Sequence, residues 1–242
     1  MAMELLTQAI SGYGNAARTR TGFYRLLSIA FRYPEPEIVA ALGNEETQNL
    51  VDEVKEVFSV MPSVAGLMDS FREEIRTLRD HSGLQVEYTR LFIGPFHLPA
   101  PPYESLYWAE SQGMVMGEPT LAVRAMYRGE GLDLSGSVHD LPDHIIAELE
   151  FMSYLAGQEA LRWEREPEGV RSCLMKQDAF LSAHLAKWTP LFTRAVVRET
   201  NEEFYLLLAR LLAGFIPLDH DYVRALTTSP DLPGWGNNGA SE

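Results

Sequence analysis

Hydrophobic residues recur with a helical period along almost the whole chain. Phe23, Leu26, Leu27 and Ala30 share one helix face, and the pattern stops at Tyr33-Pro34, where proline disfavours helix in the residue before it. The same spacing returns over residues 50–61, 64–78 and 84–92. No run of strand length alternates between apolar and polar residues. We therefore predict an all-α helical bundle with no β-sheet.

The second half of the chain carries clearer helix starts. Asp140 is expected to cap a helix that has Pro142 and Asp143 in its first turn. Thr189-Pro190 has the pattern of an N-cap followed by proline at the first helical position, which predicts a separate helix beginning there. The strongest amphipathic pattern covers residues 204–215 and predicts a long helix.

Three segments interrupt the helical pattern. Prolines alternate with aromatic residues over 94–108, which predicts a stiff extended loop. The stretch 131–139 is rich in Gly and Ser and is expected to be a connection, and after Thr227 the composition turns to Pro, Gly, Asn and Ser. We predict one all-helical domain over residues 1–227, whose two lobes could meet near 131–139, and a flexible tail over 228–242.

Charge and cysteine content narrow the class of protein. The chain has 20 basic and 34 acidic residues, a formal net charge of -14, which argues against nucleic acid or an anionic membrane as partner. The excess of acidic residues has two explanations: it could attract a cationic partner, or it could serve only to keep the protein soluble. Cys173 is the one cysteine, so an internal disulfide and a cysteine-based zinc site are excluded and a reducing compartment is favoured.

The sequence gives no indication of export or of membrane insertion. The first 20 residues lack a basic segment followed by an apolar one, so no signal peptide is expected. The most apolar stretch, 206–216, contains Arg210 and is too short to span a bilayer. We predict a cytoplasmic protein with no stable membrane insertion.

One polar cluster could carry chemistry. His139, Asp143 and His144 lie close in sequence, and Glu148 follows His144 by one helical turn, a spacing that could hold a metal ion. Against this, a single His/Glu pair supplies two ligands, and acidic residues at a helix start usually serve the helix dipole. Phosphate-binding loops and nucleophile elbows are missing from the sequence, so no catalytic residue is predicted.

Two other histidines have simpler explanations. His184 falls on or beside the apolar face of its helix and is expected to be a hydrogen-bonded core residue. His220 lies between Asp219 and Asp221 and is expected in a solvated loop.

The segment rich in proline and aromatic residues allows two interpretations. Its aromatic side chains could plug the core. Alternatively, the prolines could hold Tyr103, Tyr107 and Trp108 as a groove that grips an apolar peptide at low entropic cost. An acidic surface would then meet the basic end of the same peptide.

Two blocks of sequence resemble a known family. They are Glu87-Tyr88-Thr89-Arg90-Leu91-Phe92-Ile93-Gly94-Pro95, continuing to Pro101-Pro102-Tyr103-Glu104-Ser105-Leu106-Tyr107, and Asp143-His144 followed by Glu148-Leu149. They resemble the TorD/DmsD family of redox-enzyme maturation chaperones, related to the NarJ group, over about residues 20–215. The resemblance implies an all-α chaperone, not an enzyme, that needs no cofactor.

The resemblance also implies a partner. Such chaperones bind the N-terminal twin-arginine leader of a molybdopterin oxidoreductase precursor and hold back export until the molybdenum cofactor is inserted. The protein would act as a monomer or as a domain-swapped dimer. The alternatives are a NarJ-like assembly factor for a molybdoenzyme subunit that is not exported, and a helical metalloprotein using His139, His144 and Glu148. The client enzyme, and whether a guanine nucleotide or the molybdenum cofactor binds directly, stay open.

By resemblance, the loop and the Asp143-His144 helix start would line the leader-binding surface. Asp143 and Glu104 could pair with the leader arginines, while Tyr103, Tyr107 and Leu91 could take its apolar part. Tyr103 stands where some relatives have tryptophan, and residues 111–139 have few family landmarks. The expected leader-binding residues are Tyr88, Leu91, Phe92, Pro101, Pro102, Tyr103, Glu104, Ser105, Tyr107, Asp143, His144 and Glu148.

Overall fold

The regular elements of this computed structural model are helices. It describes residues 2–57, 62–78, 81–94, 98–108, 116–132, 141–230 and 232, with the backbone alone for 2–10, 62 and 63. The α-helices are α1 (Ala2–Ala30), α2 (Pro36–Leu42), α3 (Glu45–Val57), α4 (Pro62–Thr77), α5 (Ser82–Tyr88), α6 (Glu118–Gly129), α7 (Ile145–Arg165), α8 (Val170–Ala183), α9 (Leu185–Glu199) and α10 (Glu203–Thr228). Shorter helices are η1 (Thr89–Ile93, π-helical), η2 (Glu104–Tyr107) and η4 (Pro167–Gly169). The predicted all-α class is confirmed.

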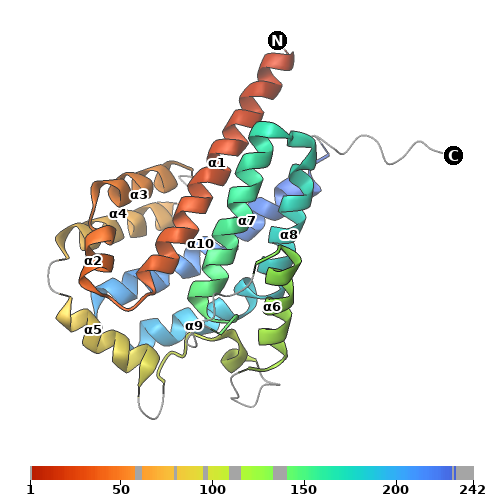
Figure 1. The fold of residues 1–242 in the computed structure, drawn as a ribbon. Helices are drawn as coiled ribbons and strands as arrows, with labels where there is room; N and C mark the ends of the chain where they lie inside the picture. Colours follow the sequence, from red (N-terminus) through yellow and green to blue (C-terminus); the bar gives the residue numbers. More distant parts are fainter. Residues whose placement is uncertain are drawn as a thin grey trace.

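Helices α1 and α7 lie side by side at the centre of the molecule (Figure 1). Helix α10 passes behind them and packs against α4, α8 and α9. Helices α2, α3 and α4 gather on one side of α1, and α6 and α8 lie on the far side of α7 (Figure 1). Within the described residues, no helix is long and apolar enough to cross a membrane.

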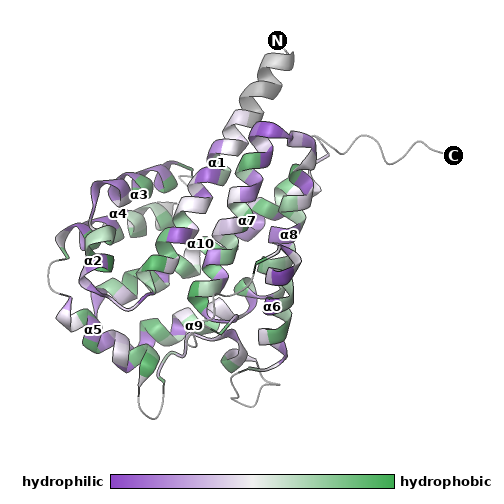
Figure 2. Cartoon of the chain, in the orientation of Figure 1, coloured by the Kyte–Doolittle hydropathy of each residue, from purple (hydrophilic) through white to green (hydrophobic). Residues whose placement is uncertain are grey.

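The amphipathic pattern of the sequence matches the core. Phe23, Leu26, Leu27 and Ala30 are all buried, as their shared helix face predicts. Phe23 packs edge-on against Phe215 of α10, with ring centroids 4.7 Å apart. Hydrophilic and hydrophobic residues alternate around the helices in Figure 2, as expected when one face of each is removed from water.

A buried arginine joins four helices. Arg20 of α1 is fully buried, pairs with Asp219 of α10 and Glu159 of α7, and donates to Gln177 of α8 at 2.6 Å. Tyr24 also donates a hydrogen bond to Asp219, at 2.6 Å. A buried charge is tolerated only when it is paired and hydrogen-bonded, so this network fixes how the four helices meet.

Two sequence predictions in this half of the chain are wrong. Thr189-Pro190 does not open a helix, because α9 begins at Leu185 and Pro190 lies inside it. The chain breaks instead at His184, where buried contacts hold the backbone, and burial of Leu185 and Trp188 offsets the hydrogen bond lost at proline. His220 is not in a loop: it lies in α10 and bonds Asp178 at 3.0 Å.

The buried apolar residues of α1 through α10 form one continuous cluster. A single cluster is the arrangement expected of one domain. The predicted lobe boundary is 131–139, and its residues 133–139 lie outside the described residues, as does most of the predicted tail. Of that tail, residues 228–230 and 232 are described: Thr228 is the last residue of α10, and Leu232 is buried.

Candidate functional site

The proline-rich loop fixes the start of α7. Tyr103 and His144 form an isolated antiparallel bridge, and the Ile145 amide donates to the Pro102 carbonyl at 2.9 Å. The Glu104 amide donates to the Asp143 carbonyl, also at 2.9 Å. Two segments forty residues apart along the sequence thus satisfy each other's backbone groups at the point where α7 begins.

The helix cap differs from the predicted one. Helix α7 begins at Ile145, so Pro142 and Asp143 precede it instead of forming its first turn. His144 is the N-cap, and its Nδ1 accepts a hydrogen bond from the Ile146 amide at 3.1 Å. Asp140, the predicted cap, lies outside the described residues. Tertiary pairing with the loop, which sequence spacing does not report, decides where this helix starts.

Beneath the loop lies a cluster that we call the buried junction, formed by Glu104, Asp143, Glu148, His184 and Trp188. His184 Nδ1 lies 2.9 Å from Glu104 Oε2, and the Trp188 indole donates to Glu148 at 3.0 Å. Asp143 accepts from the Ser105 amide at 3.0 Å. The three carboxyl groups are fully buried, so the junction joins the loop, α7, the α8–α9 break and α9 away from water.

Electrostatics within the buried junction favour one protonated carboxyl group. Burial raises the pKa of Glu148 well above its usual value, and the nearby charges of Glu104 and Asp143 raise it further. The hydrogen bond from Trp188 acts in the opposite direction. A neutral Glu148 relieves repulsion among three carboxylates that water cannot screen.

The structure brings the predicted leader-binding residues together but leaves few of them exposed. Glu104 and Asp143, expected to meet the leader arginines, have no exposed surface. Pro101, Tyr103 and Tyr107 are partly exposed. The others are buried: Tyr88, Leu91, Phe92, Pro102, Ser105, His144 and Glu148. Their part in leader binding stays a prediction. In the structure, backbone and side-chain contacts of Pro102, Ser105, Asp143 and His144 hold the loop against α7, while Tyr88 and Phe92 pack against core aromatic residues.

The described residues do not provide a complete ligand set for the metal-binding alternative. Within the described part of the chain, no three His, Cys, Asp or Glu side chains are grouped to hold an ion. His144 uses Nδ1 to cap α7, and Glu148 accepts from Trp188. His139, the third proposed ligand, is not among the described residues.

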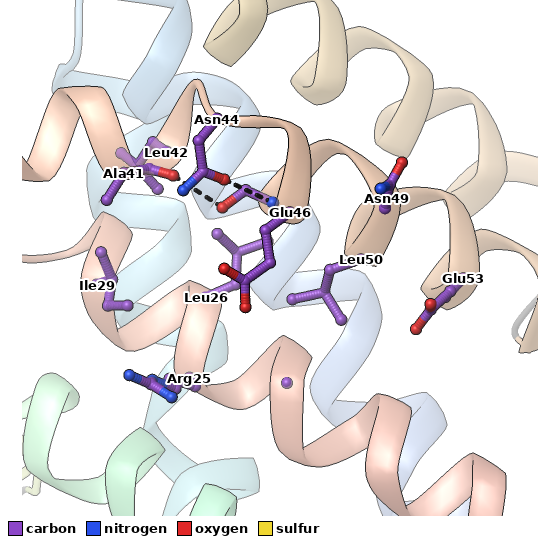
Figure 3. A pocket seen from close by; sticks show the side chains of 12 residues that line it. Arg25, Leu26, Ile29, Ala41, Leu42, Asn44, Glu46, Asn49, Leu50 and Glu53 are labelled. Atoms are coloured by element: carbon purple, nitrogen blue, oxygen red, sulfur yellow. Dashed lines mark hydrogen bonds between the residues drawn. The ribbon is translucent and has the colours of Figure 1, made fainter.

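A pocket that the sequence pattern does not predict lies between α1 and α2–α3, and we call it the α1–α3 groove. Its volume is about 550 Å³, and its apolar surface comes from Leu26, Ile29, Leu42 and Leu50. Figure 3 shows side chains of α3 extending over the pocket opposite those of α1. The groove draws its charges from Arg25, Glu46 and Glu53. Residues of three helices line it, so no single stretch of sequence reveals it.

Local structure explains how the groove is kept open. Asn44 Oδ1 accepts from the Thr47 amide at 2.8 Å, and this cap starts α3 after a short turn (Figure 3). Gly22 of α1 lines the groove opposite Leu50, where a Cβ would lie 2.7 Å from Leu50 Cδ1. The groove continues into a neighbouring pocket of about 370 Å³ that shares Arg25, Ile29 and Ala41.

Comparisons with known proteins identify the family. Residues 37–194 match the family model described as nitrate reductase delta subunit. The chaperone protein TorD of Vibrio parahaemolyticus is 27% identical over 68% of this chain and 75% of its own. A perchlorate reductase assembly chaperone protein of Dechloromonas aromatica is 28% identical over 81% of this chain and 86% of its own.

A crystal structure of a putative redox enzyme maturation protein from Archaeoglobus fulgidus is 25% identical and aligns with a TM-score of 0.49, covering 82% of this chain and 93% of that one. The family model covers well over half of the chain and includes both blocks that carry the resemblance. The chain therefore belongs to the nitrate reductase delta subunit family, the group of TorD- and NarJ-type redox-enzyme maturation proteins.

Proposed function

We propose that this protein is a cytoplasmic chaperone, not an enzyme, that binds the N-terminal twin-arginine leader of a molybdopterin oxidoreductase catalytic subunit. It would hold the precursor while the cofactor is inserted and release it for export. Family membership supports a role in redox-enzyme maturation. The names of the relatives, a TorD chaperone and a perchlorate reductase assembly chaperone, support a molybdoenzyme client.

The α1–α3 groove is the observation that carries this proposal. A twin-arginine leader combines a basic end with an apolar stretch, and the groove combines an apolar surface with two carboxylates, Glu46 and Glu53, against one cation, Arg25. Its volume of about 550 Å³ lies within the range of sites that enclose small ligands or several side chains. We therefore assign the leader's apolar stretch to the groove and its arginines to Glu46 and Glu53.

The residues expected from the family resemblance would act differently in this proposal. Pairing of leader arginines with Asp143 or Glu104 would require the buried junction to open, because both carboxyl groups are enclosed. Binding in the α1–α3 groove needs no such opening. The buried junction would then hold the loop, with Tyr103 available at the surface as a further contact.

The test is calorimetric titration of the protein with leader peptides from molybdoenzymes of the same organism. The groove variant is Glu46→Lys/Glu53→Lys, and the control is Glu45→Lys/Glu56→Lys, on the same helix with the same charge change but outside the groove. We expect the groove variant to lose about tenfold or more in affinity and the control to change by less than about threefold.

Alternative outcomes separate the site from the function. If both variants bind the leader with equal affinity, the leader binds a surface other than the α1–α3 groove. The proposed chaperone function would be unaffected by that result. If no leader binds the unmodified protein, leader recognition is wrong. The family description then favours a second function, a NarJ-like assembly factor that recognises the apo-subunit. Loss of client activity with intact client export in a deletion strain would support that function.

A further inference from the structure

A second pocket lies between the proline-rich loop and α9. Its volume is about 560 Å³, and its lining includes Pro99, Pro101, Tyr107, Leu191, Arg194 and Arg198. Leu191 is 42% exposed, so part of its apolar surface is accessible at the pocket. The walls are thus apolar, and the charges that line this pocket are positive, in contrast to the α1–α3 groove.

The outer face of α9 extends this positive character. Lys187, Leu191, Arg194 and Arg198 are exposed and follow each other by four, three and four residues, so they share one helix face. The Lys187 ammonium lies 4.9 Å from the ring centroid of Trp108 in the loop. This α9 stripe stands out on a chain whose net charge is -14.

The two arginines are only partly used by the protein itself. Arg194 Nε donates to the Pro190 carbonyl at 3.0 Å, and within the described residues no carboxylate pairs with it. Arg198 Nε donates to Glu199 at 2.8 Å, and its side chain is 73% exposed. The positive charge of Arg198 also acts on Tyr107, where burial raises the pKa of the phenol and Arg198 opposes that rise. Both guanidinium groups can therefore take a carboxylate from outside.

We infer that this pocket and the α9 stripe bind an acidic, apolar segment of a protein partner. An apolar side chain would enter between Pro101 and Leu191, while carboxylates pair with Arg194 and Arg198. A twin-arginine leader has the wrong sign for this surface, because its arginines would face Arg194 and Arg198. The inference therefore adds a second binding surface, of opposite charge and on different helices, to the proposed function.

The chain supplies a matched control. Leu121, Arg124 and Arg128 of α6 repeat the spacing of Leu191, Arg194 and Arg198, and all three are exposed. The α6 residues do not line the loop–α9 pocket. Charge reversal on α6 therefore changes the net charge by the same amount without touching the proposed site.

The probe is a rhodamine-labelled peptide, Gly-Glu-Leu-Glu-Phe-Glu-Leu-Gly, followed by fluorescence anisotropy on the full chain. A peptide with lysine in place of each glutamate is the sign control. We expect saturable binding of the acidic peptide, weaker at high salt, and about tenfold or greater loss in Arg194→Glu/Arg198→Glu. The affinity of Arg124→Glu/Arg128→Glu for the acidic peptide should lie within about twofold of that of the unmodified protein. Leu191→Gln leaves the charges unchanged and should weaken binding because it removes an apolar contact.

The inference is overturned if the acidic peptide does not saturate, if the lysine peptide binds as well, or if both double variants lose affinity equally. Circular dichroism of each variant verifies that the helices are intact, and all four substituted arginines are exposed. Leader binding measured on the same proteins separates the two ideas. Leader affinity should be unaffected by Arg194→Glu/Arg198→Glu, and failure of leader binding alone would count only against the proposed function.

Discussion

His184 Nδ1 lies 2.9 Å from Glu104 Oε2, joining residues eighty positions apart in a contact from which water is excluded. Glu104 opens η2 in the loop, and His184 is the break between α8 and α9. The contact therefore anchors the loop to the helical bundle. It also explains why α9 can begin at Leu185 in spite of Pro190.

Removing one partner of this contact should be costly. Glu104→Ala leaves His184 buried without its acceptor, and we expect the free energy of unfolding to fall by about 3 kcal/mol. Urea denaturation followed by circular dichroism measures the loss. Glu104→Gln keeps the shape and a hydrogen-bonding group, so it should lose less. If the two variants lose the same free energy of unfolding, the charge of Glu104 and not its hydrogen bond accounts for the loss.

The buried arginine should not tolerate lysine. Arg20 uses three guanidinium nitrogens to reach Asp219, Glu159 and Gln177, a fork that an ammonium group cannot reproduce. We expect Arg20→Lys to lower the free energy of unfolding by about 3 kcal/mol, measured by urea denaturation. The control is Arg18→Lys, an exposed residue of the same helix, which should change stability by less than about 0.5 kcal/mol.

Stability should depend on pH through Glu148. Its pKa is raised in the folded protein, so the folded state holds the proton more tightly than the unfolded state. The stabilisation from this group is complete below the unfolded pKa near 4.5 and is lost as pH rises through the folded value. The groups that act on this carboxyl are the charged Glu104 and Asp143, which raise its pKa, and the Trp188 indole, which lowers it.

The matching experiment compares urea denaturation of the unmodified protein and Glu148→Gln from about pH 5 to about pH 9. The variant cannot ionise at this position, so its stability relative to the unmodified protein should increase with pH. A difference that stays constant across this range would mean that Glu148 does not titrate differently on folding.

Gly22 should control the width of the α1–α3 groove. A methyl group at this position meets Leu50, whose flexible end can move aside, so Gly22→Ala should narrow the groove with little change in stability. We expect leader affinity to fall about fivefold in calorimetric titration. In a Leu50→Ala background the same substitution should have a smaller effect, because the opposing side chain is gone. Identical effects in both backgrounds would show that the two residues act separately.

Sequence alone was sufficient for the fold class and for much of the core. The helical faces of α1, α3, α4 and α10 follow directly from period 3.6, since burying one side of a helix requires apolar residues on that side. The family blocks were also visible, because unusual residue types such as the paired prolines occur in a fixed order. His184 was correctly predicted as a hydrogen-bonded core histidine.

The tertiary structure decided which charges are buried and which are exposed. Asp143, Glu104 and Asp219 look like ordinary surface acids in the sequence, yet each is enclosed because residues from distant helices supply its partners. The start of α7 and the course of α9 past Pro190 depend on those same long-range contacts. Each pocket is formed by segments that meet only on folding, so the different charges of the two pockets could not be predicted from local spacing. Periodicity reports what a single helix buries, and only packing determines which polar groups meet.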